Sequence, residues 1–84
     1  MKLDELRNQI DEIDIEMAKL FEKRMKLVRE VGDYKKEHHL PILDSSREKE
    51  VIEKNSRYIE NESLIPLYQE FLVSLMNISK KNEK

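Results

Sequence analysis

Residues 3–37 read LDELRNQIDEIDIEMAKLFEKRMKLVREVGDYKKE, and no proline interrupts them. Apolar side chains recur in this stretch at alternating spacings of three and four residues, which is the pattern of a coiled-coil seam. The pattern predicts one continuous helix from about residue 3 to about residue 37. The seam residues are Leu3, Leu6, Ile10, Ile13, Met17, Leu20, Leu27, Val31 and Tyr34.

The length of this helix has a consequence for the whole chain. At 1.5 Å per residue the helix would be roughly 50 Å long. A compact chain of 84 residues has a radius of gyration of only about 12 Å, so one chain is too small to cover the whole seam. We therefore expect a second copy to cover it, and we predict a homodimer.

The rest of the chain predicts two further helices. Pro41 ends the first helix, because the residue before a proline is disfavoured in the helical conformation. Asp44, Ser45 and Ser46 can each cap a helix, and residues 45–48, SSRE, match the S-x-x-E capping box. A second, shorter helix should therefore run from about residue 45 into the high fifties. A third helix of medium length is expected from Ser63, with Pro66 tolerated in its first turn. The polar tail, residues 80–84, is expected to fray.

Composition agrees with an all-α chain of a single domain, residues 1–84. One glycine and two prolines are too few for the turns of an all-β fold or for a glycine-rich phosphate loop. There is no cysteine, and the adjacent His38 and His39 lack the spacing of a metal site, so we expect no bound metal. The net charge of −2, with both signs interleaved, argues against nucleic-acid binding. No apolar run is long enough for a membrane span or a signal peptide, so we expect a cytoplasmic protein without a membrane partner.

One position of the seam is polar. The spacing requires an apolar residue four positions after Leu20, and the sequence has Arg24 there. A buried guanidinium needs an anionic partner, because an unpaired buried charge is strongly destabilising. Two interpretations are open. Arg24 has a structural role, either in an ion pair with a carboxylate of a neighbouring helix or as a polar residue that fixes the register of the helices, or it binds an anion through two parallel hydrogen bonds.

Other cations are candidates for the same site. Lys35 follows Arg24 by eleven residues, which places the two side chains about 20° apart around a helix; taken singly, Lys35 would extend its ammonium group to solvent. Arg47 could join them if the chain folds back at Pro41. Arg7 precedes Arg24 by roughly 25 Å along the helix, so it could approach only from an antiparallel partner chain.

Five short segments resemble the all-helical chorismate mutases in their order and spacing. Together they extend from about residue 6 to residue 50, and the similarity continues weakly to Ser79. They contain the same cations that the seam singled out. The segments are LRNQIDEID at 6–14, EKR at 22–24, VGDYK at 31–35, PILD at 41–44 and RE at 47–48.

The resemblance implies an intertwined homodimer of three-helix chains that converts chorismate to prephenate by a [3,3] Claisen rearrangement, without a cofactor. Such a reaction moves no proton, so it is accelerated by holding a chair-like conformer and by cations near the ether oxygen that gains negative charge. A dianionic substrate would also supply the counter-charge that Arg24 lacks. By analogy the arginines Arg24, Arg47 and the other chain's Arg7, with Ser79, bind the substrate carboxylates, Lys35 binds the ether oxygen, and Glu48 with the region of Asp44 binds the ring hydroxyl.

Glu83 departs from the bacterial pattern, which usually has glutamine four residues after Ser79; fungal relatives have glutamate there. Only a protonated Glu83 could donate a second hydrogen bond to the ether oxygen. Two other functions stay open. An isochorismate-pyruvate lyase of the same fold would bind a nearly identical dianion, and a non-catalytic helical dimerisation or regulatory module would bind none.

Overall fold

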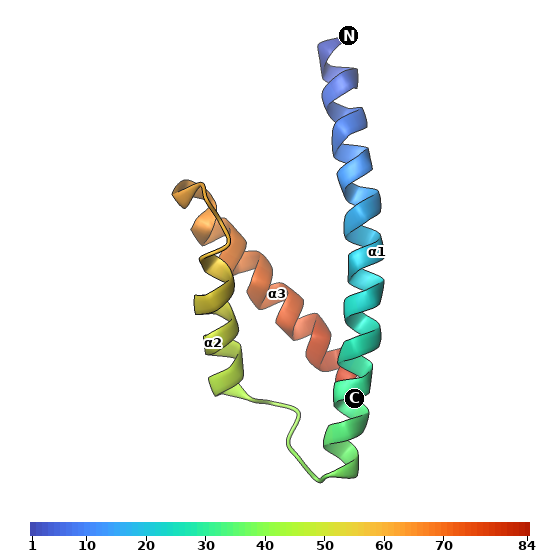
Figure 1. The fold of residues 1–84 in the computed structure, drawn as a ribbon, viewed down its shortest axis with the longest axis vertical. Coiled ribbons are helices and arrows are strands. Elements are labelled where there is room, and N and C mark those ends of the chain that lie inside the picture. Colours follow the sequence, from blue (N-terminus) through green and yellow to red (C-terminus); the bar gives the residue numbers. More distant parts are fainter.

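The computed structural model describes all residues, 1–84, and contains three α-helices and no strands. α1 spans Lys2–Glu37, α2 spans Ser45–Ser56 and α3 spans Ile65–Glu83; a short 3₁₀ helix, η1, spans Glu62–Leu64 (Figure 1). The predicted all-α class is confirmed, and the bounds of the first two helices agree closely with those expected from the seam and from Pro41. No helix is apolar over a stretch long enough to cross a bilayer.

α2 and α3 form a helical hairpin, and α3 also packs against the long helix α1. α2 and α3 run in opposite directions, and α3 contacts both α2 and α1, which do not pack on each other (Figure 1). The N-terminal end of α1 extends well beyond the other helices. The chain therefore measures 56 × 25 × 15 Å with a radius of gyration of 15.9 Å, more than the value of about 12 Å for a compact chain of this length.

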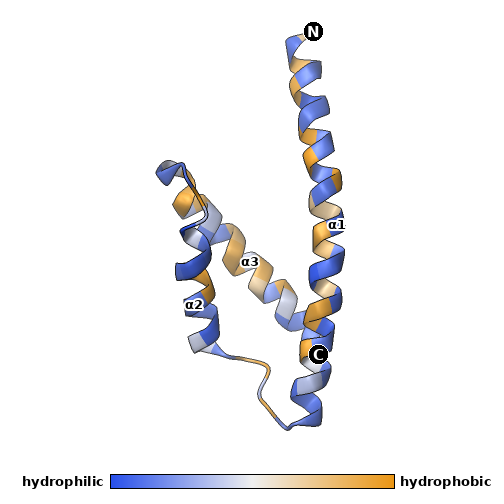
Figure 2. Ribbon diagram, viewed as in Figure 1, coloured by the Kyte–Doolittle hydropathy of each residue, from blue (hydrophilic) through white to orange (hydrophobic).

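The apolar core of the single chain is very small. Leu72 and Met76 of α3 are its only buried hydrophobic side chains. Figure 2 shows apolar segments recurring along the whole of α1, and at the seam positions Leu20 and Leu27 the residues are each 61% exposed. A contiguous apolar surface of this kind marks an interaction site in most proteins. The seam is thus left uncovered by its own chain.

α2 begins at Ser45 as expected, whereas α3 begins later than expected. Asp44, and not Ser45, caps α2: its Oδ1 accepts a hydrogen bond from the backbone N–H of Arg47 at 3.0 Å. Of the three predicted caps the structure thus confirms Asp44, and the capping box of Ser45 and Glu48 is not formed. α3 begins two residues after the predicted Ser63, because the 3₁₀ turn precedes it, and Pro66 lies in its first turn as expected.

The C-terminal turn of α3 is fixed against α1, so the prediction of a frayed tail is wrong. The side-chain amide of Asn82 donates to the carbonyl of Met25 at 2.7 Å, and Glu83 is buried. The two helices come very close at Gly32, where a β-carbon would lie 2.7 Å from the Cα of Glu83 and nearer still to its carbonyl oxygen. The only glycine of the chain therefore allows the end of α3 to reach α1.

Candidate active site

A cavity of about 190 Å³ lies where the three helices converge. Seven of the eight side chains predicted for the site line it, and only Arg7 does not. Five apolar side chains and one further cation, Lys80, complete its wall. The predicted residues along it are Arg24, Lys35, Asp44, Arg47, Glu48, Ser79 and Glu83.

Arg24 is half-buried on the α1 side of this cavity. Its Nη1 donates to Oγ of Ser79 on α3, and that hydroxyl in turn donates to the backbone carbonyl of Leu75 at 2.7 Å. No carboxylate of the chain forms an ion pair with Arg24. Within one chain, the interpretation of Arg24 as half of a structural ion pair is therefore wrong. Its guanidinium donates to a neutral hydroxyl, and its other N–H groups remain available to bind an anion.

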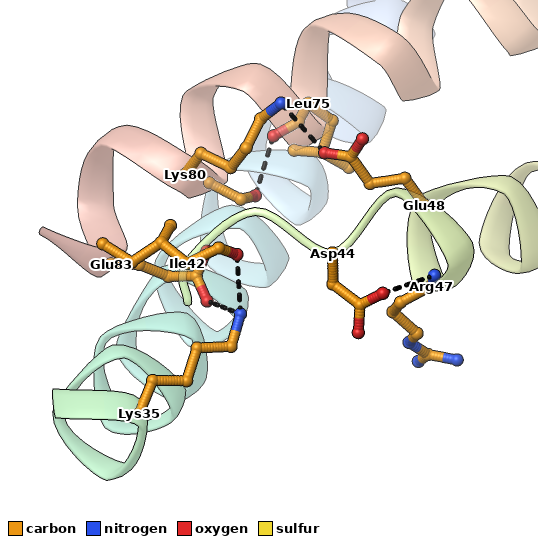
Figure 3. Close-up of polar contacts among 9 residues, drawn as sticks. Lys35, Ile42, Asp44, Arg47, Glu48, Leu75, Lys80 and Glu83 are labelled. Carbon is orange, nitrogen blue, oxygen red and sulfur yellow. Dashed lines mark hydrogen bonds and ion pairs between the residues drawn. The ribbon is translucent and has the colours of Figure 1, made fainter. Parts of the chain in front are cut away.

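Lys35 and Glu83 form the most buried ion pair of the chain. Nζ of Lys35 lies 2.7 Å from Oε1 of Glu83 and donates to the carbonyl oxygen of Ile42 at 2.9 Å (Figure 3). The side chains are 19% and 9% exposed, respectively. The expectation that Lys35 extends to solvent is therefore wrong. The cause is the helical C-terminal turn, which brings a carboxylate to a lysine 48 positions earlier in the sequence.

Glu48 is held by a residue that sequence reasoning missed. Its Oε1 lies 2.9 Å from Nζ of Lys80, which reaches across from α3 (Figure 3). Lys80 belongs to the polar tail that the sequence predicts to fray. The available signal was helical spacing, since Met76, Ser79, Lys80 and Glu83 lie at i, i+3, i+4 and i+7 and share one face of α3.

Asp44 and Arg47 lie at the N-terminal end of α2, and both line the cavity. Asp44 is engaged as the helix cap. The guanidinium of Arg47 is paired with Glu50 of the same helix at 3.0 Å and is largely exposed. Arg47 is therefore free to exchange a surface carboxylate for a ligand, because exposed pairs of this type contribute little to stability.

Arg7 is exposed near the free end of α1 and contributes nothing to the cavity of its own chain. It lies seventeen residues before Arg24 on the same uninterrupted helix, which corresponds to roughly 25 Å. No bend of α1 brings the two together, so the geometry of one chain leaves this predicted site residue apart from the others.

The charges of the cavity suit a small, compact anion. Four cations face three carboxylates along the wall, while five apolar side chains offer contact to an uncharged ring. The apolar residues are Val28, Val31, Ile42, Val51 and Met76. No set of three His, Asp or Glu side chains is arranged to hold a metal ion. The arrangement can bind an anion, hold its conformation and stabilise negative charge that develops on it.

Comparison with known proteins gives a consistent family match. The profile described as chorismate mutase type II matches residues 6–84. The chain is 34% identical over 88 aligned positions to the bifunctional chorismate mutase/prephenate dehydratase of Aquifex aeolicus, covering 95% of this chain and 24% of that protein. It is 35% identical over 82 positions to the T-protein of Haemophilus influenzae, covering 96% and 22%.

A shorter match is to the chorismate mutase of Methanocaldococcus jannaschii, with 40% identity over 53 positions, covering 63% of this chain and 54% of that protein. The chain thus spans about a quarter of the length of the first two relatives and about half of the third. No solved structure matches it significantly.

Proposed function

This chain belongs to the type II chorismate mutase family, and from that premise we propose that it converts chorismate to prephenate. The observation that carries the proposal is the shared cavity: seven side chains that the family resemblance assigns to the site line one pocket of about 190 Å³. The central cation of that pocket, Arg24, has no carboxylate partner of its own chain. A dianionic substrate would supply the missing carboxylate.

In the proposed reaction the ether C–O bond breaks while a new C–C bond forms within one molecule. No proton is transferred, so the residues act by binding one conformer and by stabilising charge. Arg24, Arg47 and Ser79 would hold the two carboxylates. An ammonium group has three donors; Lys35 uses one for Ile42 and one for Glu83, which leaves the third for the ether oxygen.

Glu83 lies beside Lys35 and would face the same ether oxygen. An ionised carboxylate there opposes the negative charge that develops on this oxygen in the transition state. The protonated carboxyl instead donates a second hydrogen bond. We therefore propose that the active form of the site carries a protonated Glu83.

We also propose that the working unit is a homodimer. A second groove of about 770 Å³ between α1 and α3 is lined mainly by apolar side chains, and it adjoins the first cavity at Arg24. The exposed seam of α1 in a second copy has the length and the apolar character to fill it. In an antiparallel arrangement that copy would bring its Arg7 to the cavity. The apolar lining is Met17, Ala18, Leu20, Phe21, Phe71, Leu75 and Ile78.

The experiment that tests the activity is incubation of the purified chain with chorismate, with prephenate quantified by chromatography. We expect prephenate to form without any added cofactor. Arg24→Ala should abolish turnover, whereas Arg29→Ala should keep it, because Arg29 is exposed and pairs only with Asp33 and the Asn82 carbonyl. Release of pyruvate from isochorismate, without turnover of chorismate, would instead identify a lyase. No turnover of either compound would favour a non-catalytic dimerisation or regulatory module.

A further inference from the structure

Only two of the five ion pairs in the chain connect different helices, and both lie at the cavity. Lys35 joins α1 to Glu83 of α3, and Lys80 of α3 joins Glu48 of α2. The other three connect residues three or four positions apart on exposed helix surfaces, where ion pairs contribute little. The cavity pairs are thus set apart by both position and burial.

Lys80 is the cavity cation to which the family resemblance assigns no role. It follows Ser79 directly and precedes Glu83 by three residues, so α3 presents it on the face that closes the cavity. The side chains of Lys80 and Glu48 are 30% and 28% exposed. Neither side chain has another hydrogen-bond or ion-pair partner in the chain. Figure 3 shows the two reaching toward each other from α3 and α2.

We propose that Lys80 is a positioning residue that holds the carboxylate of Glu48 against the hydroxyl-bearing edge of the substrate ring. The inference rests on the proposed function, in which Glu48 accepts the hydrogen bond of that hydroxyl. A carboxylate beside a dianion is repelled by it, and a glutamate side chain has three torsions through which to move away. The ammonium group of Lys80 offsets the repulsion and fixes one carboxylate oxygen, while the other remains free to accept.

The ion pair between Lys80 and Glu48 also affects which ligands the site prefers. A Glu48 held in one place recognises a hydroxyl only at the matching position of the ring. A substrate or inhibitor without that hydroxyl leaves the ionised carboxylate without its donor, which a site built for hydrogen bonding penalises strongly. Lys80 should therefore affect how well the site distinguishes ligands with the hydroxyl from ligands without it, more than it affects binding of the carboxylates.

The test compares two probes by calorimetry: an oxabicyclic diacid that mimics the chair-like transition state and carries the ring hydroxyl, and the same diacid without it. The Kd of the diacid without the hydroxyl, divided by the Kd of the diacid that carries it, measures how strongly the site recognises the hydroxyl. We expect Lys80→Met to lower this ratio roughly tenfold, the equivalent of one charge-assisted hydrogen bond. Lys80→Arg should restore it to within about threefold, since arginine keeps the charge. Lys81→Met, an exposed neighbour without an ion pair, is the matched control and should leave the ratio unchanged.

A double variant separates positioning from a purely structural role. In the Lys80→Met background, Glu48→Gln should lower the ratio no further, because the group that Lys80 positions is already displaced. If Lys80→Met weakens both probes equally, or lowers the melting temperature without changing the ratio, Lys80 is structural and the proposal fails. Should Lys80→Met not fold, Lys80→Gln, which keeps a polar contact to Glu48, is measured in the same way against the same expected ratio.

The wild-type protein keeps this test distinct from that of the proposed function. Failure of the wild type to convert chorismate overturns the proposed function, and the role of Lys80 falls with it. Turnover by the wild type together with an unchanged ratio in Lys80→Met overturns the positioning role alone.

Discussion

Replacing Gly32 with alanine should damage activity far more than stability. A β-carbon at this position would lie 2.7 Å from Cα and 2.8 Å from the carbonyl carbon of Glu83. Both are backbone atoms, so no side chain can rotate away. To restore the ordinary separation of at least 3.4 Å from Cα, the last turn of α3 must retreat from α1 by at least about 0.7 Å, and the carbonyl oxygen of Glu83, which would lie nearer still, raises the required retreat to about 1 Å. The retreat displaces Glu83 and its contact with Lys35.

Two opposing effects set the change in stability. Overpacking costs about 1–3 kcal/mol, whereas alanine in the interior of a helix is about 1 kcal/mol more favourable than glycine. We therefore expect a net loss of about 0–2 kcal/mol. A displacement of about 1 Å in a positioned catalytic group can reduce the rate on the order of 100-fold. We therefore expect kcat/KM to fall by much more than the small loss of stability alone would cause.

The measurement pairs thermal denaturation with steady-state kinetics on chorismate. Glu30→Ala is the matched control, because Glu30 is exposed on the same helix and forms no ion pair. It should leave both stability and kcat/KM close to wild type. A Gly32→Ala protein with wild-type kcat/KM and about 1 kcal/mol greater stability, the helix-propensity gain alone, would refute the close approach of α3.

Three further predictions address the charges of the site. Arg24→Ala should abolish turnover yet leave the melting temperature of the ligand-free protein unchanged or higher, since it strands no carboxylate; a loss of about 3–5 kcal/mol would show a structural ion pair instead. Mixing inactive Arg7→Ala and Arg24→Ala chains should restore about a quarter of wild-type activity, because half of the randomly formed dimers are mixed and each mixed dimer has one intact site of two. If activity does not recover although subunit exchange is proven, the site is not shared between the chains. Glu83→Gln, whose amide donates a hydrogen bond without needing a proton, should raise kcat/KM on chorismate near neutral pH; a kcat/KM equal to that of the wild type would remove Glu83 from the ether oxygen.

The features predicted correctly from the sequence are those that local patterns determine. The alternating seam defined α1 because a long amphipathic helix repeats its signal every turn. Pro41 located its end to within a few residues, because the restriction on the residue before a proline excludes a longer helix. The polar residue at the seam, Arg24, indicated a site because it violates the local pattern. These signals need no knowledge of which residues meet in space.

The features that were missed depend on contacts between residues far apart in the sequence. The tail looked solvated because it is polar, but Asn82 and Glu83 find partners on α1 more than forty positions away. Lys80 was missed for the same reason, because it belongs to the polar tail and its partner Glu48 lies far away in the sequence, on α2. The predicted capping box is not formed because Asp44, one residue before it, provides the cap, and Glu48 is then free to face the cavity.

The charges along the cavity connect the proposed dimer to the proposed substrate. In one chain with Glu83 ionised, as in its ion pair with Lys35, four cations face three carboxylates, which leaves one net positive charge for a ligand that carries two negative ones. Arg7 of the partner subunit would bring the excess to two and make the site neutral as the dianion binds; the protonated Glu83 of the active form then leaves one positive charge in excess, which favours the negative charge that develops on the ether oxygen. A monomer with Glu83 ionised would bind the dianion with one charge uncompensated, in a partly buried setting where that imbalance is costly. On this argument the exposed seam of α1 serves catalysis as well as folding, because the contact that covers it also completes the charge of the site.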